Sequence, residues 1–135
     1  MTDHLEVGIF DWIDDARGDP ADAYERRLRV VEFAEQAGFA RYHVAEHHGT
    51  PLGMAASPNV LLSAVATRTS RIRLGPLVTL PPIFHPLRQI EETAMLDHLS
   101  RGRYDLGVGR GAVGYELSYF GIDGGQTRAM PDESF

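Results

Sequence analysis

The chain has 135 residues, which is enough for one domain with a sizeable core. Hydrophobic residues make up 43% of the chain and charged residues 24%, a balance that excludes a disordered tail, a collagen-like repeat and a coiled coil. The formal net charge of −6 disfavours nucleic acid and anionic membranes as main partners. The chain contains no cysteine, and all thirteen of its basic residues are arginine. Disulfides, thiolate sites and lysine Schiff bases are therefore excluded.

Neither a membrane span nor a secretory leader is visible in the sequence. No apolar run approaches the ~18 residues that a membrane helix needs. The first four residues lead into no positively charged and apolar stretch of the kind that signal peptides carry. We therefore expect a cytoplasmic protein with no membrane partner.

Short apolar runs alternate along the chain with amphipathic helical patterns. Asp19-Pro20, Ser57-Pro58 and His85-Pro86 each open a helical pattern, and Gly38 and Gly102 end two of these patterns. A short helix is expected over 115–120, and a further helix near Pro131. The runs predict four strands, over 5–10, 41–45, 72–78 and 104–108.

The strict alternation of strands and helices predicts an α/β fold with a parallel sheet and crossover helices. Strands that are apolar on both faces fit this arrangement. In such folds the carboxyl ends of the strands form the ligand-binding face. Residues that follow the predicted strands are therefore the first candidates for a functional site.

Glu46, His47 and His48 follow the second predicted strand. Adjacent residues that leave a strand point to opposite sides, so the two histidines are not expected to bind one metal ion together. One of them is suited to proton transfer near neutral pH, and His48 is interpreted as a packing residue. Glu46 is placed either to accept hydrogen bonds from a polar ligand or to pair with an arginine.

A glycine-rich run, Gly107 to Gly111, follows the fourth predicted strand and continues to Gly114. It contains a literal G-x-G-x-x-G, the dinucleotide fingerprint. That motif normally follows the first strand, so a nicotinamide-binding half of a doubly wound dehydrogenase is disfavoured. Arg110 within the run favours a phosphate cradle instead. A metal-dependent barrel hydrolase is weaker still, because no paired-histidine motif ends the first strand.

Taken together, these motifs resemble the bacterial luciferase-like flavin-dependent monooxygenases. The resemblance runs in order through the whole chain and depends on the joint spacing of its motifs. They are Ala45-Glu46-His47-His48, Leu80-Pro81, His85-Pro86-Leu87-Arg88-Gln89, Ser100-Arg101-Gly102-Arg103-Tyr104, Gly107-Val108-Gly109-Arg110-Gly111 and Phe120-Gly121. The resemblance implies a (β/α)8 barrel, reduced FMN and O2 as co-reactants, a small organic substrate and a homodimer. A separate flavin reductase is one possible source of the reduced FMN.

The resemblance also implies roles for individual residues. Glu46 corresponds to a carboxylate beside the flavin, and His47 to the histidine proposed as catalytic base. Leu77 and Val78 fall where luciferases have a non-proline cis peptide bond under the flavin ring. The remaining cofactor-binding positions are Gly109, which replaces a reactive cysteine near the flavin, and Arg110 and Arg128, which correspond to two arginines that hold the flavin phosphate.

The length departs from this family, because a (β/α)8 barrel needs about 250 residues. Residues 1–135 correspond to the N-terminal half of the TIM barrel, with four parallel strands. Two interpretations stay open: a piece of a longer protein, or a half-barrel that completes itself by association. The function expected is that of a flavin-dependent monooxygenase. The alternative is a non-catalytic flavin-binding or dimerisation fragment, which pairs through helices 58–69 and 86–99.

Overall fold

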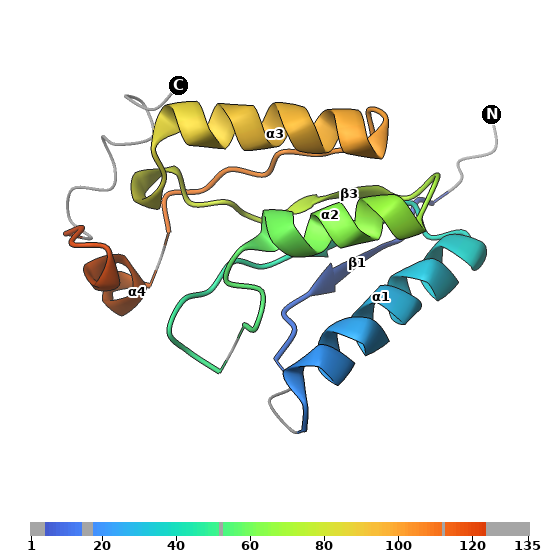
Figure 1. Ribbon diagram of the computed structural model, residues 1–135, viewed down its shortest axis with the longest axis horizontal. Helices are drawn as coiled ribbons and strands as arrows, with labels where there is room; N and C mark the ends of the chain where they lie inside the picture. The colour runs from blue at the N-terminus through green and yellow to red at the C-terminus, as the bar shows by residue number, and fades with distance from the viewer. Residues whose placement is uncertain (1–4, 15–17, 52, 112, 124–135) are drawn as a thin grey trace.

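The computed structural model describes residues 5–14, 18–51, 53–111 and 113–123 (Figure 1). The region 124–135, where a further helix near Pro131 was expected, lies outside them. None of the helices in the described part is long and apolar enough to cross a membrane. The elements follow the order β1 (Gly8–Asp11), α1 (Pro20–Gln36), β2 (Arg41–Val44), α2 (Pro58–Arg68), β3 (Arg73–Pro76), a 3₁₀ turn η1 (Pro81–Ile83), α3 (Pro86–Ser100) and α4 (Gly114–Tyr119).

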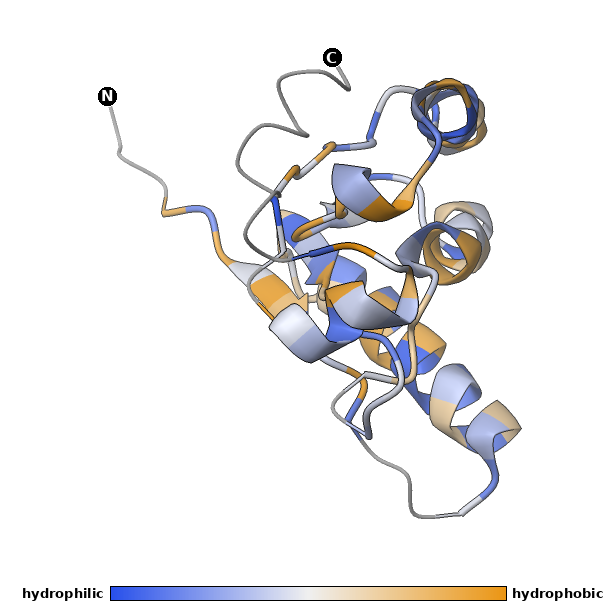
Figure 2. Ribbon diagram, turned by 90° about the vertical axis from the view of Figure 1, so that its left-hand side faces the viewer, coloured by the Kyte–Doolittle hydropathy of each residue, from blue (hydrophilic) through white to orange (hydrophobic). Residues whose placement is uncertain are grey.

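The three strands form one parallel sheet in the order β1-β2-β3. Gly8 pairs with Arg41, and Arg41 pairs in turn with Arg73, so the strands begin level with one another. Helices α1, α2 and α3 lie on the same side of this sheet in both ribbon views (Figures 1 and 2). The sheet and the helices therefore form two layers, as predicted from the alternation of the sequence.

The prediction of a fourth strand over 104–108 is wrong, because the described residues form three strands and this segment is not one of them. That segment runs beside β3 and makes only two single parallel bridges, Leu74 with Tyr104 and Thr79 with Val108. The backbone N–H of Leu74 donates to the carbonyl of Arg103, and that of Thr79 to the carbonyl of Gly107. Between them stands Pro76, which has no N–H to donate. The ladder on this side of β3 is interrupted there.

Two glycines allow the segment 104–108 to approach β3. A Cβ on Gly75 would overlap the backbone carbonyl of Asp105, and a Cβ on Gly107 would overlap the carbonyl oxygen of Pro76. Backbone atoms cannot move aside as a flexible side chain can. The close contact between the two segments therefore requires glycine at both positions.

Several helix ends follow local sequence signals. The Asp19 carboxylate accepts the backbone N–H of Ala21 at 2.9 Å and caps α1 as predicted. Ser57 precedes α2, but its side chain makes no capping hydrogen bond. At the end of α3, Arg101 adopts a left-handed conformation with φ of 59°, followed by Gly102 with φ of 80°.

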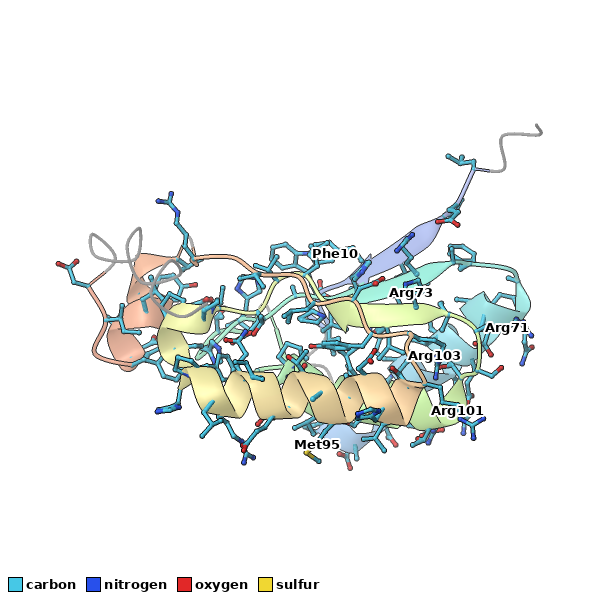
Figure 3. The ribbon with its side chains drawn as sticks, turned by 90° about the horizontal axis from the view of Figure 1, so that it is seen from above. Phe10, Arg71, Arg73, Met95, Arg101 and Arg103 are labelled. Carbon is cyan, nitrogen blue, oxygen red and sulfur yellow. The ribbon has the colours of Figure 1, made fainter. Side chains whose placement is uncertain are left out.

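The hydrophobic core lies between the sheet and the helices. It includes Tyr42, Val44 and Leu74 from the strands. Val44 and Ile72 are both buried in this helix-facing core. Strand side chains alternate between the two faces of a sheet, so the opposite face carries other residues. Figure 3 shows Phe10 and Arg73 on that face, pointing away from α3.

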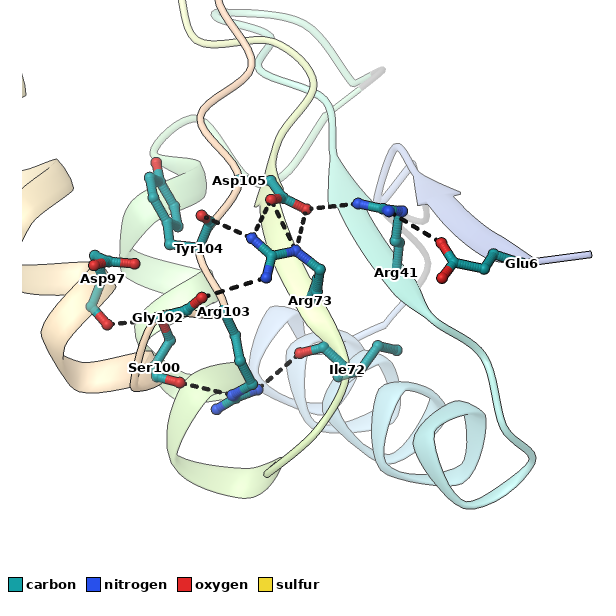
Figure 4. Close-up of polar contacts among 10 residues, drawn as sticks. All are labelled: Glu6, Arg41, Ile72, Arg73, Asp97, Ser100, Gly102, Arg103, Tyr104 and Asp105. Carbon is teal, nitrogen blue, oxygen red and sulfur yellow. Dashed lines mark hydrogen bonds and ion pairs between the residues drawn. The ribbon is translucent and has the colours of Figure 1, made fainter. Parts of the chain in front are cut away.

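The face of the sheet that no helix covers in the described part of the chain carries an ionic cluster at the amino ends of the strands (Figure 4). Asp105 accepts hydrogen bonds from Arg73 and, at 3.1 Å, from Arg41, which also pairs with Glu6 at 3.0 Å. The hydrogen bond from the Arg73 guanidinium lowers the pKa of the Asp105 carboxyl. This cluster fixes the segment 104–108 against the starts of β2 and β3, at the end of the sheet opposite the glycine-rich turn.

Candidate active site

A cavity of about 350 Å³ lies at the carboxyl ends of the strands. Each wall comes from a segment that directly follows a strand or the 104–108 segment, and α4 closes one side. The cavity is therefore where the parallel fold predicts a ligand site. It is lined by Phe10, Trp12, Ala45, Glu46, His47, Leu77, Val78, Leu80, Gly109, Arg110, Gly111, Val113 and Glu116.

His47 lies in this cavity and is held by two neighbours. Its Nδ1 is 2.9 Å from Oε1 of Glu116 on α4, a side chain that is buried. The indole of Trp12 stacks on the imidazole with ring centroids 4.8 Å apart and planes at 28°. The hydrogen bond fixes one ring nitrogen, so Nε2 is the nitrogen left to exchange a proton with a ligand. This arrangement suits general acid–base chemistry.

His48 does not line the cavity. Its Nε2 lies 2.9 Å from Oε1 of Glu46, and its ring meets Phe120 edge-on at 4.9 Å. The two adjacent histidines thus turn in different directions, as the strand geometry predicted. In this structure His48 packs and supports Glu46, which fits its interpretation as a packing residue.

Glu46 is buried, with a side chain that is 0% exposed, yet it reaches the cavity wall. Burial raises the pKa of its carboxyl above the usual 4.5, and His48, the Leu80 backbone N–H and the Thr79 hydroxyl offset this only in part. Within the described part of the chain, no donor reaches Oε2 in hydrogen-bond geometry. A buried acceptor without a partner is costly, so a donor that reached this oxygen would be stabilising.

Leu77, Val78 and Gly109 form an apolar part of the wall. The peptide bond between Leu77 and Val78 is cis, the isomer that the resemblance implies at this position. A Cβ on Gly109 would overlap the Val78 side chain. Glycine at 109 therefore lets the glycine-rich turn pass directly over the end of β3.

Arg110 is exposed at the rim of the same cavity, on the glycine-rich turn. Its place on a glycine-rich turn that follows segment 104–108 suits the binding of an anionic group. Arg128, the second arginine expected at the flavin phosphate, lies outside the described residues. The structure thus brings together His47, Glu46, Leu77, Val78, Gly109 and Arg110, all the other residues expected at the site.

Trp12 and Glu116 are the two cavity residues in contact with His47 that the sequence did not single out. Glu116 lies 69 positions after His47, so no local spacing links the two. Trp12 follows β1 directly, and its place after a strand was a usable signal. Because an aromatic residue after a strand is more often part of a core, Trp12 was not chosen as a site residue.

The comparisons with known proteins agree with this geometry. The model of the family described as luciferase-like monooxygenase matches residues 5–135. The chain belongs to the luciferase-like monooxygenase family. The uncharacterized protein y4wF of Sinorhizobium fredii is 53% identical over 123 residues, which cover 91% of this chain and 36% of y4wF.

Solved structures of similar proteins show the same fold. The monooxygenase RslO1 from Streptomyces bottropensis matches with a TM-score of 0.92 and 34% identity, covering 96% of this chain and 40% of RslO1. The oxygenating constituent of 3,6-diketocamphane monooxygenase from Pseudomonas putida, solved with FMN, matches in fold with a TM-score of 0.90 and 23% identity, over 96% of this chain and 37% of that one. The chain spans about a third of the length of the curated relatives it matches.

Proposed function

We propose that this chain forms the N-terminal half of the barrel of an FMN-dependent monooxygenase, which uses reduced FMN and O2 to oxidise a small organic substrate. The observation that carries the proposal is that one cavity is lined both by Glu46, whose buried Oε2 has no donor among the described residues, and by a histidine held by a second carboxylate. Membership of the luciferase-like monooxygenase family supports this interpretation.

The residues of the cavity fit a flavin. Its ring system is flat, largely apolar and edged with N–H donors, and Oε2 of Glu46 is a buried acceptor to which no residue in the described ranges donates. Leu77, Val78 and Gly109 offer a smooth apolar surface next to it. At the rim, Arg110 offers a cation for the phosphate, and we infer that Arg128 is its partner.

When bound, reduced flavin supplies the electrons that activate O2. The chain's own residues position it and handle protons. Glu46 orients the ring by accepting a hydrogen bond at Oε2, while His47 holds or delivers a proton at Nε2. Glu116 keeps the His47 imidazole in one orientation through Nδ1. The apolar walls reduce the access of water.

The same proposal includes a homodimer formed through α2 and α3, in the cytoplasm, with reduced FMN supplied by a separate flavin reductase. Val60 on α2 is 72% exposed, and Met95 and Leu99 on α3 are 63% and 53% exposed. These apolar side chains share a shallow groove between the two helices. Figure 3 shows Met95 pointing away from the sheet. Burying this patch against a second copy would remove apolar surface from water.

The test combines FMN binding with oxygen uptake in the presence of reduced FMN and a long-chain aldehyde. The proposal predicts saturable binding of FMN to the cavity and, in the complete protein, oxygen uptake that depends on the aldehyde. FMN binding without any such uptake would favour the non-catalytic flavin-binding alternative. Absence of FMN binding would contradict both.

A further inference from the structure

Asp11 is a buried carboxylate at the end of β1 that the proposed chemistry does not use. It is 9% exposed. Its Oδ2 accepts the hydroxyl hydrogen of Tyr42 on β2 at 2.9 Å and lies 3.5 Å from Nε of Arg27 on α1. Its Oδ1 accepts the backbone N–H of Ile13 at 3.0 Å. One side chain therefore joins β1, β2, α1 and the loop after β1.

The loop after β1 contains an unfavourable backbone conformation at Ile13. This residue has a φ of 47°, in the left-handed region that a β-branched side chain rarely adopts. Its side chain is 1% exposed, and its carbonyl accepts the N–H of Met54 at 3.0 Å. The conformation is thus stabilised by two hydrogen bonds, one from the Ile13 N–H to Asp11 and one from the Met54 N–H to the Ile13 carbonyl.

Trp12 lies between Asp11 and Ile13, so this turn determines where its indole goes. The indole stacks on His47 at 4.8 Å and meets the Phe10 ring edge-on at 5.9 Å. Gly53 lies close to both residues, because a Cβ there would come within 2.9 Å of Cβ of His47 and 3.6 Å of the Trp12 carbonyl oxygen. Because Trp12 directly precedes Ile13, the backbone conformation of this turn determines both the left-handed φ of Ile13 and the position of the indole against His47.

We propose that Asp11 is a positioning residue, which keeps the Trp12 indole stacked on His47 by holding the left-handed turn at Ile13. Asp11 does not touch the cavity and acts only through its neighbours. The functional part of this inference rests on the proposed function, because it takes His47 as the residue that handles protons. The structural part, that Asp11 determines the position of Trp12, does not depend on flavin.

Tyr42 is the second residue that holds the turn, because its hydroxyl donates to Asp11. Burial and the neighbouring Asp11 carboxylate raise the pKa of the Tyr42 phenol, so it remains a hydrogen-bond donor. An asparagine at position 11 offers one acceptor oxygen where aspartate offers two, and it carries no charge for Arg27. Either the Ile13 N–H or the Tyr42 hydroxyl then loses its acceptor.

The test uses Trp12, which is the only tryptophan in the sequence, so tryptophan emission reports this residue alone. Quenching of the emission by acrylamide is measured for the native chain, Asp11→Asn and Tyr42→Phe. Asp14→Asn is the matched control, because it removes the same charge from a side chain that is 67% exposed and also lies 3.5 Å from Arg27. Circular dichroism establishes that each variant is folded.

We expect Asp11→Asn to raise the acrylamide quenching constant about twofold, since a lost buried hydrogen bond frees the indole. Tyr42→Phe should raise it by a smaller amount, and Asp14→Asn should leave it unchanged. His47→Ala should also raise the quenching constant. The double variant Asp11→Asn with His47→Ala should have a quenching constant close to that of either single variant, because both changes disrupt the same contact between Trp12 and His47. Asp11→Asn should slow oxygen uptake in the complete protein.

Unchanged quenching in folded Asp11→Asn and Tyr42→Phe would overturn the inference. If Asp11→Asn does not fold, the Tyr42→Phe result decides alone. Absence of FMN binding in the native chain would contradict the proposed function and leave the emission result standing.

Discussion

Arg110 gives the most direct test of the anion-binding end of the cavity. The guanidinium is exposed at the rim on a glycine-rich turn. A charge-assisted hydrogen bond to phosphate is worth about 1.5–3 kcal/mol, so Arg110→Ala should weaken FMN binding about tenfold or more. Quenching of FMN fluorescence on binding measures the affinity. Arg29→Ala, which removes an equally charged and exposed side chain on α1, should have no effect.

The two adjacent histidines should differ in their effect on turnover. His47 lines the cavity and pairs with Glu116, whereas His48 pairs with Glu46 and lies behind the wall. His47→Ala should slow product formation by about 10²-fold, the usual contribution of a general acid or base, without unfolding the protein. Steady-state oxygen uptake compares the two variants. A large loss with His48→Ala alone would show that the roles are reversed.

Glu46 should make stability fall as the pH rises. Because burial raises the pKa of its carboxyl above 4.5, the folded chain binds this proton more tightly than the unfolded chain does. The stabilisation is complete below pH 4.5 and is lost as the pH rises through the raised pKa.

Urea denaturation at several pH values measures this effect. As the pH rises above 4.5 and through the raised pKa, the free energy of unfolding of the native chain should fall more steeply than that of Glu46→Gln, which cannot ionise. Glu91→Gln, at an exposed position on α3, should keep the native slope. Parallel slopes for the native chain and Glu46→Gln would show that Glu46 is not the group responsible.

Much of the candidate site could be predicted from the sequence, because its residues directly follow strands. His47, Glu46 and Arg110 come immediately after runs whose carboxyl ends must meet at one edge. Trp12 and Glu116 could not be predicted as site residues, for different reasons. Glu116 comes from α4 and reaches His47 only through tertiary packing. Trp12 depends on the turn at Ile13, and no sequence pattern predicts a left-handed β-branched residue.

Among the secondary-structure elements, the contact between β3 and segment 104–108 offers a sharp test. A Cβ on Gly75 would overlap the Asp105 carbonyl, so Gly75→Ala must separate the two segments. Such overpacking against backbone should cost about 3 kcal/mol or more of unfolding free energy in urea denaturation. Gly114→Ala, where nothing lies within 4 Å of the new Cβ, should be close to neutral. Equal stability of the two variants would contradict this account of the contact.

The helices and the three strands could be predicted because their signals are local. Asp19 before Pro20 marked the start of α1, and the αL residues at 101–102 follow the end of α3. The fourth strand was wrong because an apolar run does not reveal whether its partner can supply every hydrogen bond. Pro76 has no N–H to donate, and the hydrogen bond that is lost would have joined β3 to segment 104–108, which is distant in sequence. Strands that are apolar on both faces also do not show which face meets the helices, so the burial of Val44 and Ile72 against the helices could not be predicted.

As a separate species, the 135-residue chain should associate and turn over poorly. β1 and segment 104–108 form the two edges of the sheet among the described residues, and unpaired edges invite association. The face that carries Phe10 and Arg73 is not covered by a helix in the described structure. We expect dimers or larger species in sedimentation, weak FMN binding and inefficient oxygen uptake. A stable monomer that couples oxygen uptake to aldehyde oxidation would contradict this expectation.

The measurement that tests the flavin site most directly is a titration of the chain with FMN, followed by the emission of Trp12. This residue is the only tryptophan in the sequence and lines the cavity beside His47. FMN bound in the cavity must lie close to the indole, so the emission should fall along a saturable curve. Free tryptophan at the same absorbance provides the control. A decrease no larger than in that control, without saturation, would contradict the flavin site proposed for this cavity.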